Sequence, residues 1–251
     1  MLKKIFNRKT LFGFIFFTMA FSSIYLVVRI IVAPAVVDHG EVGARAKSDY
    51  IFMLVQCIGG MFALMLPSLI ARRLKIVIPS AMIAAYAIFL YCAVYLGEVH
   101  LFFYKVHHWD VILHSFSGFM LGALGLTLIN FLNKTDRIPM SLAPLFVAIF
   151  TFCFAVTLGV IWEIYEFSVD YFFHTNMQKF ALEDGTQLIG QAALMDTMKD
   201  LIVDCVGALV FSIFGYISLK LKKGWHKKWL LFRETGNETT EDKMVQDLNV
   251  S

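Results

Sequence analysis

Residues 196–207, DTMKDLIVDCVG, place three acidic side chains at the start of the last long apolar segment of the chain. Asp196, Asp200 and Asp204 recur every four residues, so on a helix their carboxylates fall along one face. The residues between and after them are those of a membrane span. A carboxylate inside hydrocarbon costs at least ~2.5 kcal/mol, so this acidic stripe requires polar partners from the rest of the chain.

The composition predicts an all-α, polytopic membrane protein. Apolar residues make up 59% of the 251 residues and charged residues 16%, whereas an ordinary soluble domain has roughly 25% charged residues. The formal net charge is +3, from 22 Lys and Arg against 19 Asp and Glu. Because the basic residues lie in short clusters between apolar runs, this charge gives no indication of nucleic-acid binding.

Six apolar runs predict a bundle of six transmembrane helices. The expected spans are about residues 11–32, 50–71, 76–96, 110–132, 142–165 and 196–219. The first run exceeds the ~7–15 residues of a secretory signal's apolar core, so it is expected to be a retained span. Residues 1–10 then form a basic N-terminus, residues 11–219 the membrane domain, and residues 220–251 a tail that is first basic and then acidic and disordered. The amphipathic connection, residues 166–195, is expected to lie on the membrane surface or to fold back over a site.

The distribution of lysine and arginine predicts the orientation of this bundle. Six spans place both termini on one side of the membrane, and most basic residues lie on that side. The opposite side holds only Arg45, Lys47, Lys105, Lys179 and Lys199. By the positive-inside rule, both termini are expected in the cytoplasm.

With this topology, three stripes of ionisable side chains meet at the extracytoplasmic ends of spans four to six. Their members recur at spacings of three or four residues: His107, Asp110 and His114; Glu163, Glu166 and Asp170; Asp196, Asp200 and Asp204. Arg29 in span one lies at a comparable depth and is the expected counter-ion. Glycines in spans four and six (Gly118, Gly122, Gly125 and Gly207) predict close helix packing nearby.

Histidines and carboxylates gathered in this way suit a divalent metal such as zinc, manganese or magnesium. Helical bundles build metal sites from such pairs on facing helices. The candidate ligands are His107, Asp110, His114, Glu163, Asp200 and Asp204, with Arg29, Asp170 and Asp196 completing the polar cluster. Glu166 or His114 is the candidate general base. The alternative interpretation is structural, because buried acids can simply neutralise nearby cations and histidines.

Three motifs in this order resemble the YjdF-like family of small bacterial inner-membrane proteins. They are HHWDxxxHxxxG (residues 107–118), WEIYE (162–166) and DTxxDxxxDxxGA (196–208). The resemblance implies a multi-pass protein of the bacterial plasma membrane. A looser similarity in motif order is to VanZ-like membrane proteins, linked to glycopeptide resistance, but Asp204 stands where an Asn is expected.

Three functions are compatible with these residues. The first is a metal-dependent hydrolase or transferase acting on a lipid or lipid-linked substrate at the outer leaflet. The second is a cation- or proton-coupled transporter, in which the acids bind the coupling ion. The third is a non-catalytic membrane scaffold or envelope-stress factor. The expected partners are the lipid bilayer and a lipid substrate, without nucleic acid.

Overall fold

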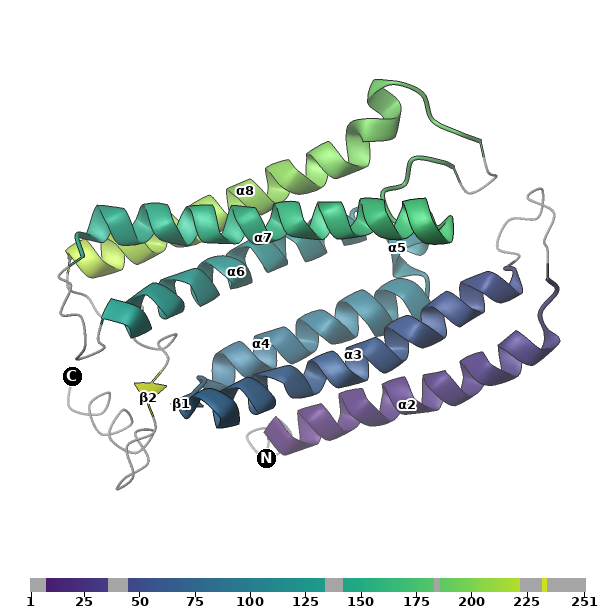
Figure 1. Cartoon of the computed structure of the whole chain (residues 1–251), viewed down its shortest axis with the longest axis horizontal. Coiled ribbons are helices and arrows are strands. Elements are labelled where there is room, and N and C mark those ends of the chain that lie inside the picture. The colour runs from purple at the N-terminus through teal and green to yellow at the C-terminus, as the bar shows by residue number, and fades with distance from the viewer. Residues whose placement is uncertain (1–7, 36–44, 134–141, 183–185, 222–231, 234–251) are drawn as a thin grey trace.

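The computed structural model describes residues 8–35, 45–133, 142–182, 186–221 and 232–233, and these residues form a helical bundle (Figure 1). Six helical segments are long and apolar enough to cross a membrane, which confirms the predicted six-span, all-α fold. They are α2 (Arg8–Val32), α3 (Lys47–Leu74), α4 with its π-helical continuation η1 (Ser80–Leu90 and Tyr91–Val99), α6 (Trp109–Asn133), α7 (Pro144–Phe173) and α8 (Gln191–Lys220). The expectations for residues 1–7 and for most of the tail lie outside the described residues.

The short elements connect these helices. Helix α5 (Phe102–Lys105) precedes α6, and strands β1 (Ile76–Val77) and β2 (Phe232–Arg233) form a two-residue antiparallel pair. The π-helical turns of η1 are a feature that the sequence did not predict, and they hold Glu98 near the end of the third span. Single π-type turns inside helices often occur at functional sites.

Two of the site helices are longer than predicted. Helix α7 continues to Phe173 rather than ending at Tyr165, because aromatic and apolar residues extend its lipid-facing side. Helix α8 begins at Gln191 rather than at Asp196, directly after Gly190, whose φ of 63° is a conformation that favours glycine. Asp170 and Asp196 therefore lie within helices, and the connection between them shrinks to residues 174–190.

The bundle consists of two three-helix groups. Helices α6, α7 and α8 pack extensively against one another, whereas α2, α3 and the α4–η1 segment form the second group. The groups meet more sparsely, where α4 and η1 lie against α6 (Figure 1). Helix α2 begins and α8 ends at the same end of the bundle. The opposite end, where α6 and α8 begin and α7 ends, is called the site end below.

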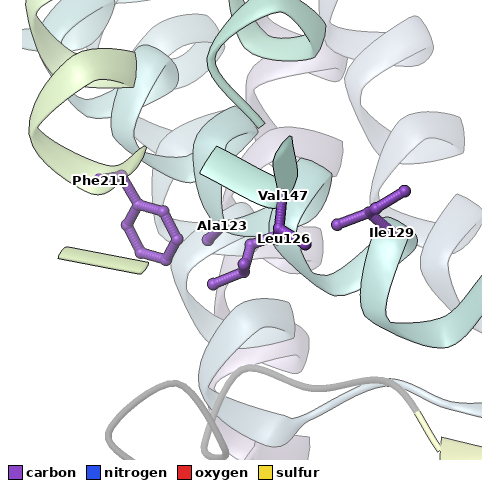
Figure 2. Close-up of a cluster of buried hydrophobic side chains, with 5 residues drawn as sticks. All are labelled: Ala123, Leu126, Ile129, Val147 and Phe211. Atoms are coloured by element: carbon purple, nitrogen blue, oxygen red, sulfur yellow. The ribbon is translucent and has the colours of Figure 1, made fainter. Parts of the chain in front are cut away.

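An apolar core fills the α6–α7–α8 group away from the site end. Figure 2 shows its buried members, which are Ala123, Leu126, Ile129, Val147 and Phe211. Phe119, Phe150 and Phe214 pack around them. This core closes the interior of the group beneath the polar cluster, so the burial of apolar surface and the burial of charge occur at different depths.

Glycines allow α6 and α8 to approach closely beside the polar cluster. A Cβ atom on Gly118 would lie 2.6 Å from the backbone oxygen of Asp204, and one on Gly207 would lie 2.8 Å from the backbone oxygen of Ser115. Gly159 of α7 borders the same place, since a Cβ there would lie 2.8 Å from Asp204 Oδ2. The predicted close packing at Gly118 and Gly207 is confirmed, and it brings the side chains of α6 within reach of those on α8.

Candidate metal centre

Three side chains from α6 and α8 converge at the site end. His114 Nε2 lies 3.8 Å from Asp110 Oδ1 and 3.8 Å from Asp200 Oδ2. One ligand atom from each of the three residues lies within 4.8 Å of the other two. His114 and Asp200 are buried, and Asp110 is half-buried in the first turn of α6. Distances of 3.8 Å are too long for hydrogen bonds, so the three groups face a common point without bonding to one another.

Asp204 holds the opposite nitrogen of the same imidazole ring. Its Oδ2 lies 3.3 Å from His114 Nδ1, and its Oδ1 accepts a hydrogen bond of 2.9 Å from the Ser117 hydroxyl. A carboxylate is an acceptor, so the neutral ring carries its proton on Nδ1 and its lone pair on Nε2. That lone pair then points toward the carboxylates of Asp110 and Asp200. A carboxylate that orients a histidine in this way is common behind metal-ligating histidines.

Lys179 provides the cation that the sequence assigned to Arg29. Its ammonium group donates to Asp110 Oδ2 and lies 3.1 Å from Asp196 Oδ1. Burial by itself would lower the pKa of Lys179, but the carboxylates of Asp110 and Asp196 outweigh this effect and raise the pKa above its ordinary value. Lys179 is therefore charged at neutral pH. Asp110 is shared, with Oδ1 toward His114 and Oδ2 toward Lys179.

Asp170 anchors the segment that carries Lys179, residues 174–182, which we call the strap. The buried Asp170 carboxylate accepts hydrogen bonds from the Thr175 hydroxyl at 2.6 Å and from the backbone N–H groups of Met177 at 2.7 Å and Gln178 at 2.9 Å. The Gln178 side chain also donates to Thr197 of α8 at 2.8 Å. The strap thus crosses from α7 to α8 over the acidic cluster, and the carboxylate of Asp170 is directed to the strap.

Two glutamates of α7 complete the interior of the cluster. Glu163 is 5% exposed, and neither of its carboxylate oxygens has a hydrogen-bond partner among the described residues. His114 and Asp204 lie near enough for their charges to act on it. Glu166 is 8% exposed and accepts a hydrogen bond of 2.9 Å from Trp162 Nε1, one turn earlier on the same helix. An ionised carboxylate placed like Glu163 needs a proton or a cation beside it.

Two sequence-predicted residues lie outside this arrangement. His107 is exposed and packs against the neighbouring ring of His108, with centroids 3.6 Å apart, and it is not part of the three-residue group. Arg29 donates a hydrogen bond of 2.6 Å to the Tyr50 hydroxyl and lies over the same ring. The expected pairing of Arg29 with the acids is therefore wrong, because Tyr50 of the adjacent helix α3 binds its guanidinium.

The sequence also missed three residues that lie at the cluster. Lys179 was counted only for membrane orientation, and Ser117 carries no pattern of its own. Glu98 forms a side-chain hydrogen bond with Gln56 and lies near Arg45, Asp110 and Lys179. Glu98 and Gln56 come from the other three-helix group. The sequence contains one indication of the contact between Glu98 and Gln56. Gln56 is a polar residue inside the second apolar run, where a side-chain amide needs a hydrogen-bond partner.

The donor set fits a small divalent cation. One imidazole nitrogen and two carboxylate oxygens are ligands that zinc and manganese accept, and the pairing of Nδ1 with Asp204 leaves Nε2 free to bind. Ligand atoms ~2.1 Å from a zinc ion lie roughly 3.4 Å apart in a tetrahedron. The two separations of 3.8 Å from His114 Nε2, and the limit of 4.8 Å within which all three ligand atoms lie, therefore require the ligands to contract around an ion.

The comparisons with known proteins support the membrane assignment. The chain matches no curated protein and no solved structure. One family model, described as a predicted membrane protein (DUF2238), matches residues 17–221. This range begins within the first candidate span, Thr10–Val32, and contains the other five in full, together with the strap and the candidate metal centre. The chain is thus a multi-pass membrane protein that belongs to the predicted membrane protein family DUF2238.

Proposed function

We propose that the protein is a metal-dependent hydrolase or transferase of the bacterial plasma membrane that acts on a lipid or lipid-linked substrate. The site end then faces the outside of the cell and both termini face the cytoplasm, as the distribution of basic residues predicts. The similarity of the three motifs to YjdF-like proteins supports the same location. A bound metal would polarise a carbonyl or phosphoryl oxygen of the substrate and would supply an activated water.

The observation that carries this proposal is the arrangement around His114. Asp204 binds Nδ1, and Nε2 faces Asp110 and Asp200 at equal distances of 3.8 Å. A lone pair and two carboxylates directed at one point repel each other unless a cation or proton lies between them. A proton on His114 Nε2 would relieve the same repulsion in a purely structural ion-pair network, and metal uptake distinguishes that network from a metal centre.

The two glutamates of α7 are the candidates for proton transfer. Glu163 has both oxygens available and lies beside His114, so it is placed to take a proton from water or to return one to a leaving group. The Trp162 hydrogen bond fixes one oxygen of Glu166, which favours a role in positioning Glu163 or the substrate. His114 is better used as a ligand than as the base, since its Nε2 faces the carboxylates of Asp110 and Asp200.

The position of the apolar core favours an enzyme over a transporter. A transported ion needs polar groups that continue toward the far end of the bundle. Beneath the cluster, however, Phe211 and Leu126 fill the space between α6, α7 and α8 (Figure 2). The polar groups are thus reached from the site end, as expected for a site that works at one leaflet.

Metal stoichiometry of the purified protein tests the proposal. The full chain in detergent is dialysed against zinc or manganese, and bound metal is counted by inductively coupled plasma mass spectrometry. We expect one ion per chain for the wild type and loss of that ion in Asp200→Asn and His114→Gln. Asp170→Asn is the matched control, because this equally buried carboxylate binds the strap. A folded wild type that takes up no metal above the level of Asp200→Asn refutes the proposal.

A non-catalytic scaffold is the second candidate, and the Lys179 contacts favour it. The ammonium group of Lys179 neutralises part of the negative charge of Asp110 and Asp196 without any metal. In a scaffold, Lys179→Met would destabilise the bundle and metal would not restore the loss. In the proposed enzyme, metal binding raises the stability of the same variant by mass action. Thermal unfolding with and without zinc separates the two functions.

A further inference from the structure

We propose that Asp110 and Asp196 form a subsite for a primary ammonium group on the substrate, and that Lys179 occupies this subsite when substrate is absent. The inference rests on the proposed function and names the substrate class, a lipid whose headgroup carries a primary amine. In this structure a cation already fills the subsite, since the Lys179 ammonium contacts both carboxylates.

The geometry matches the needs of an –NH₃⁺ group. The two carboxylates come from different helices, α6 and α8, and converge on one nitrogen from two sides. An ammonium carries three donors and no acceptor, so it suits a place lined by acceptor oxygens. A trimethylated ammonium has no N–H groups and could not make these hydrogen bonds. The subsite therefore distinguishes ethanolamine-type headgroups from choline-type headgroups.

The shared carboxylate links this subsite to the metal centre. Asp110 directs Oδ2 to the ammonium and Oδ1 toward His114 Nε2, so both positions can be filled together. In an ethanolamine headgroup, two carbons separate the nitrogen from the phosphate ester. An amine held at Asp110 and Asp196 thus sets the adjacent ester beside the metal ligands. It also brings polar atoms toward Glu163, whose oxygens otherwise have no partner among the described residues.

Lys179 is placed so that a ligand can displace it. Its side chain is 31% exposed, and those of Asp110 and Asp196 are 19% and 20% exposed, so the subsite opens outward. The strap is held by Asp170 and Thr197 and not by Lys179 alone, so the lysine can leave while the strap stays attached. Lys179 itself has a φ of 48°, an uncommon conformation for a residue other than glycine.

The charge of the cluster favours a cationic headgroup over an anionic one. Asp200, Glu163 and Glu98 lie around the subsite in addition to the two carboxylates that bind the amine. One divalent metal and one ammonium do not neutralise so many acids. A phosphate without an accompanying ammonium would meet net repulsion here, whereas a zwitterionic aminophospholipid contributes its own cation.

Competitive lipid binding tests the subsite. The full chain in detergent is mixed with equal amounts of dioleoyl phosphatidylethanolamine and dioleoyl phosphatidylcholine, and bound lipids are counted by native mass spectrometry. We expect only a weak preference for the ethanolamine lipid in the wild type, because its headgroup must displace Lys179 from the subsite. Lys179→Met should bind the ethanolamine lipid about tenfold better than the choline lipid, as expected for charge-assisted hydrogen bonds gained by one headgroup only.

Control variants make the result specific. Lys199→Met removes an exposed lysine from the first turns of α8, near Asp196, and should keep the wild-type ratio of bound lipids. Lys179→Arg retains the positive charge and should also keep that ratio. Adding Asp196→Asn to Lys179→Met should return the ratio toward one. Circular dichroism and size-exclusion chromatography confirm that each variant is folded before its lipids are counted.

Several outcomes decide the inference. Equal binding of the two lipids to folded Lys179→Met overturns it, as does a preference of that variant for phosphatidylglycerol. Displacement of the ethanolamine lipid by soluble glycerophosphoethanolamine at equal concentration supports the ammonium subsite but assigns its ligand to a soluble amine. Metal content is measured on the same samples, so loss of the metal centre and loss of the ammonium subsite are observed separately.

Discussion

Replacing Gly118 by alanine should separate α6 from α8 and weaken the candidate metal centre. The added Cβ would lie 2.6 Å from the backbone oxygen of Asp204 and 3.0 Å from its Cα, whereas ordinary van der Waals contact begins near 3.4 Å. Backbone atoms cannot rotate away as a side chain can. The variant therefore requires α8 to move by about 0.8 Å at Asp204, because the clash is with its main chain.

This displacement has a calculable effect on the site. The distance from His114 Nδ1 to Asp204 Oδ2 is 3.3 Å, so a shift of about 0.8 Å takes the pair beyond hydrogen-bond range. Overpacking costs typically about 1–3 kcal/mol, and the higher helix propensity of alanine returns up to about 1 kcal/mol. We expect a net loss of about 1–2 kcal/mol of unfolding free energy. Loss of the group that orients His114 should weaken metal binding by about 10–100-fold.

Two measurements on detergent-purified protein check this prediction. Thermal unfolding should show a midpoint lowered by roughly 2–4 °C per kcal/mol, and zinc titration should show the weakened affinity. Gly59→Ala is the matched control, because a Cβ at this helical glycine of α3 meets nothing within 4 Å. Its zinc affinity should equal that of the wild type, and its unfolding free energy should rise by up to about 1 kcal/mol through the same gain in helix propensity. If Gly118→Ala behaves like Gly59→Ala, then α6 and α8 do not cross as closely as described, and the link between helix packing and the site is wrong.

Three further predictions concern the surroundings of the metal centre. Asp170→Ala removes the acceptor of three strap hydrogen bonds, so residues 174–182 should exchange amide hydrogens faster while the helices stay protected, as hydrogen–deuterium exchange would show. Ser117→Ala removes the donor to Asp204 Oδ1 and should lower zinc affinity with little loss of stability, and unchanged affinity would argue against a role for Asp204 behind His114. Chelation with EDTA should lower the unfolding midpoint of the wild type but not that of Asp200→Asn, and an equal decrease in both proteins would place the metal elsewhere.

Hydropathy and residue spacing were sufficient to predict the fold and the helices that carry the site. Each span is a long apolar run, and the three- and four-residue spacings of the acids require a helical face. Helix ends were predicted less well. Helix α8 starts directly after Gly190 because of the backbone conformation of this glycine, and apolar periodicity carries no information about backbone conformation. Asp170 looked like a member of the cluster because spacing does not reveal what a carboxylate binds.

The counter-ion could not be predicted for a related reason. Arg29 lies at the right depth, but depth does not determine which helix is adjacent, and Tyr50 of α3 is the neighbour that binds it. Lys179 lies in a segment without periodicity, where hydrogen bonds such as those of Asp170 and Thr197 fix the path of the chain. Contacts between distant segments, such as those of Lys179 with Asp110 and Asp196, depend on tertiary packing that one sequence does not specify.

The sparse seam between the two three-helix groups has a mechanical consequence. His114, Asp110, Asp200 and Asp204 all belong to the tightly packed α6–α8 pair, whereas Glu98 lies on the other side of the seam, near Asp110. A sliding motion of one group against the other would therefore change the distance between Glu98 and Asp110 and leave the four side chains of α6 and α8 in place relative to one another. The π-helical end of the third span, η1, lies at this seam and would move relative to α6. The candidate metal centre would keep its geometry, because its residues all lie on α6 and α8.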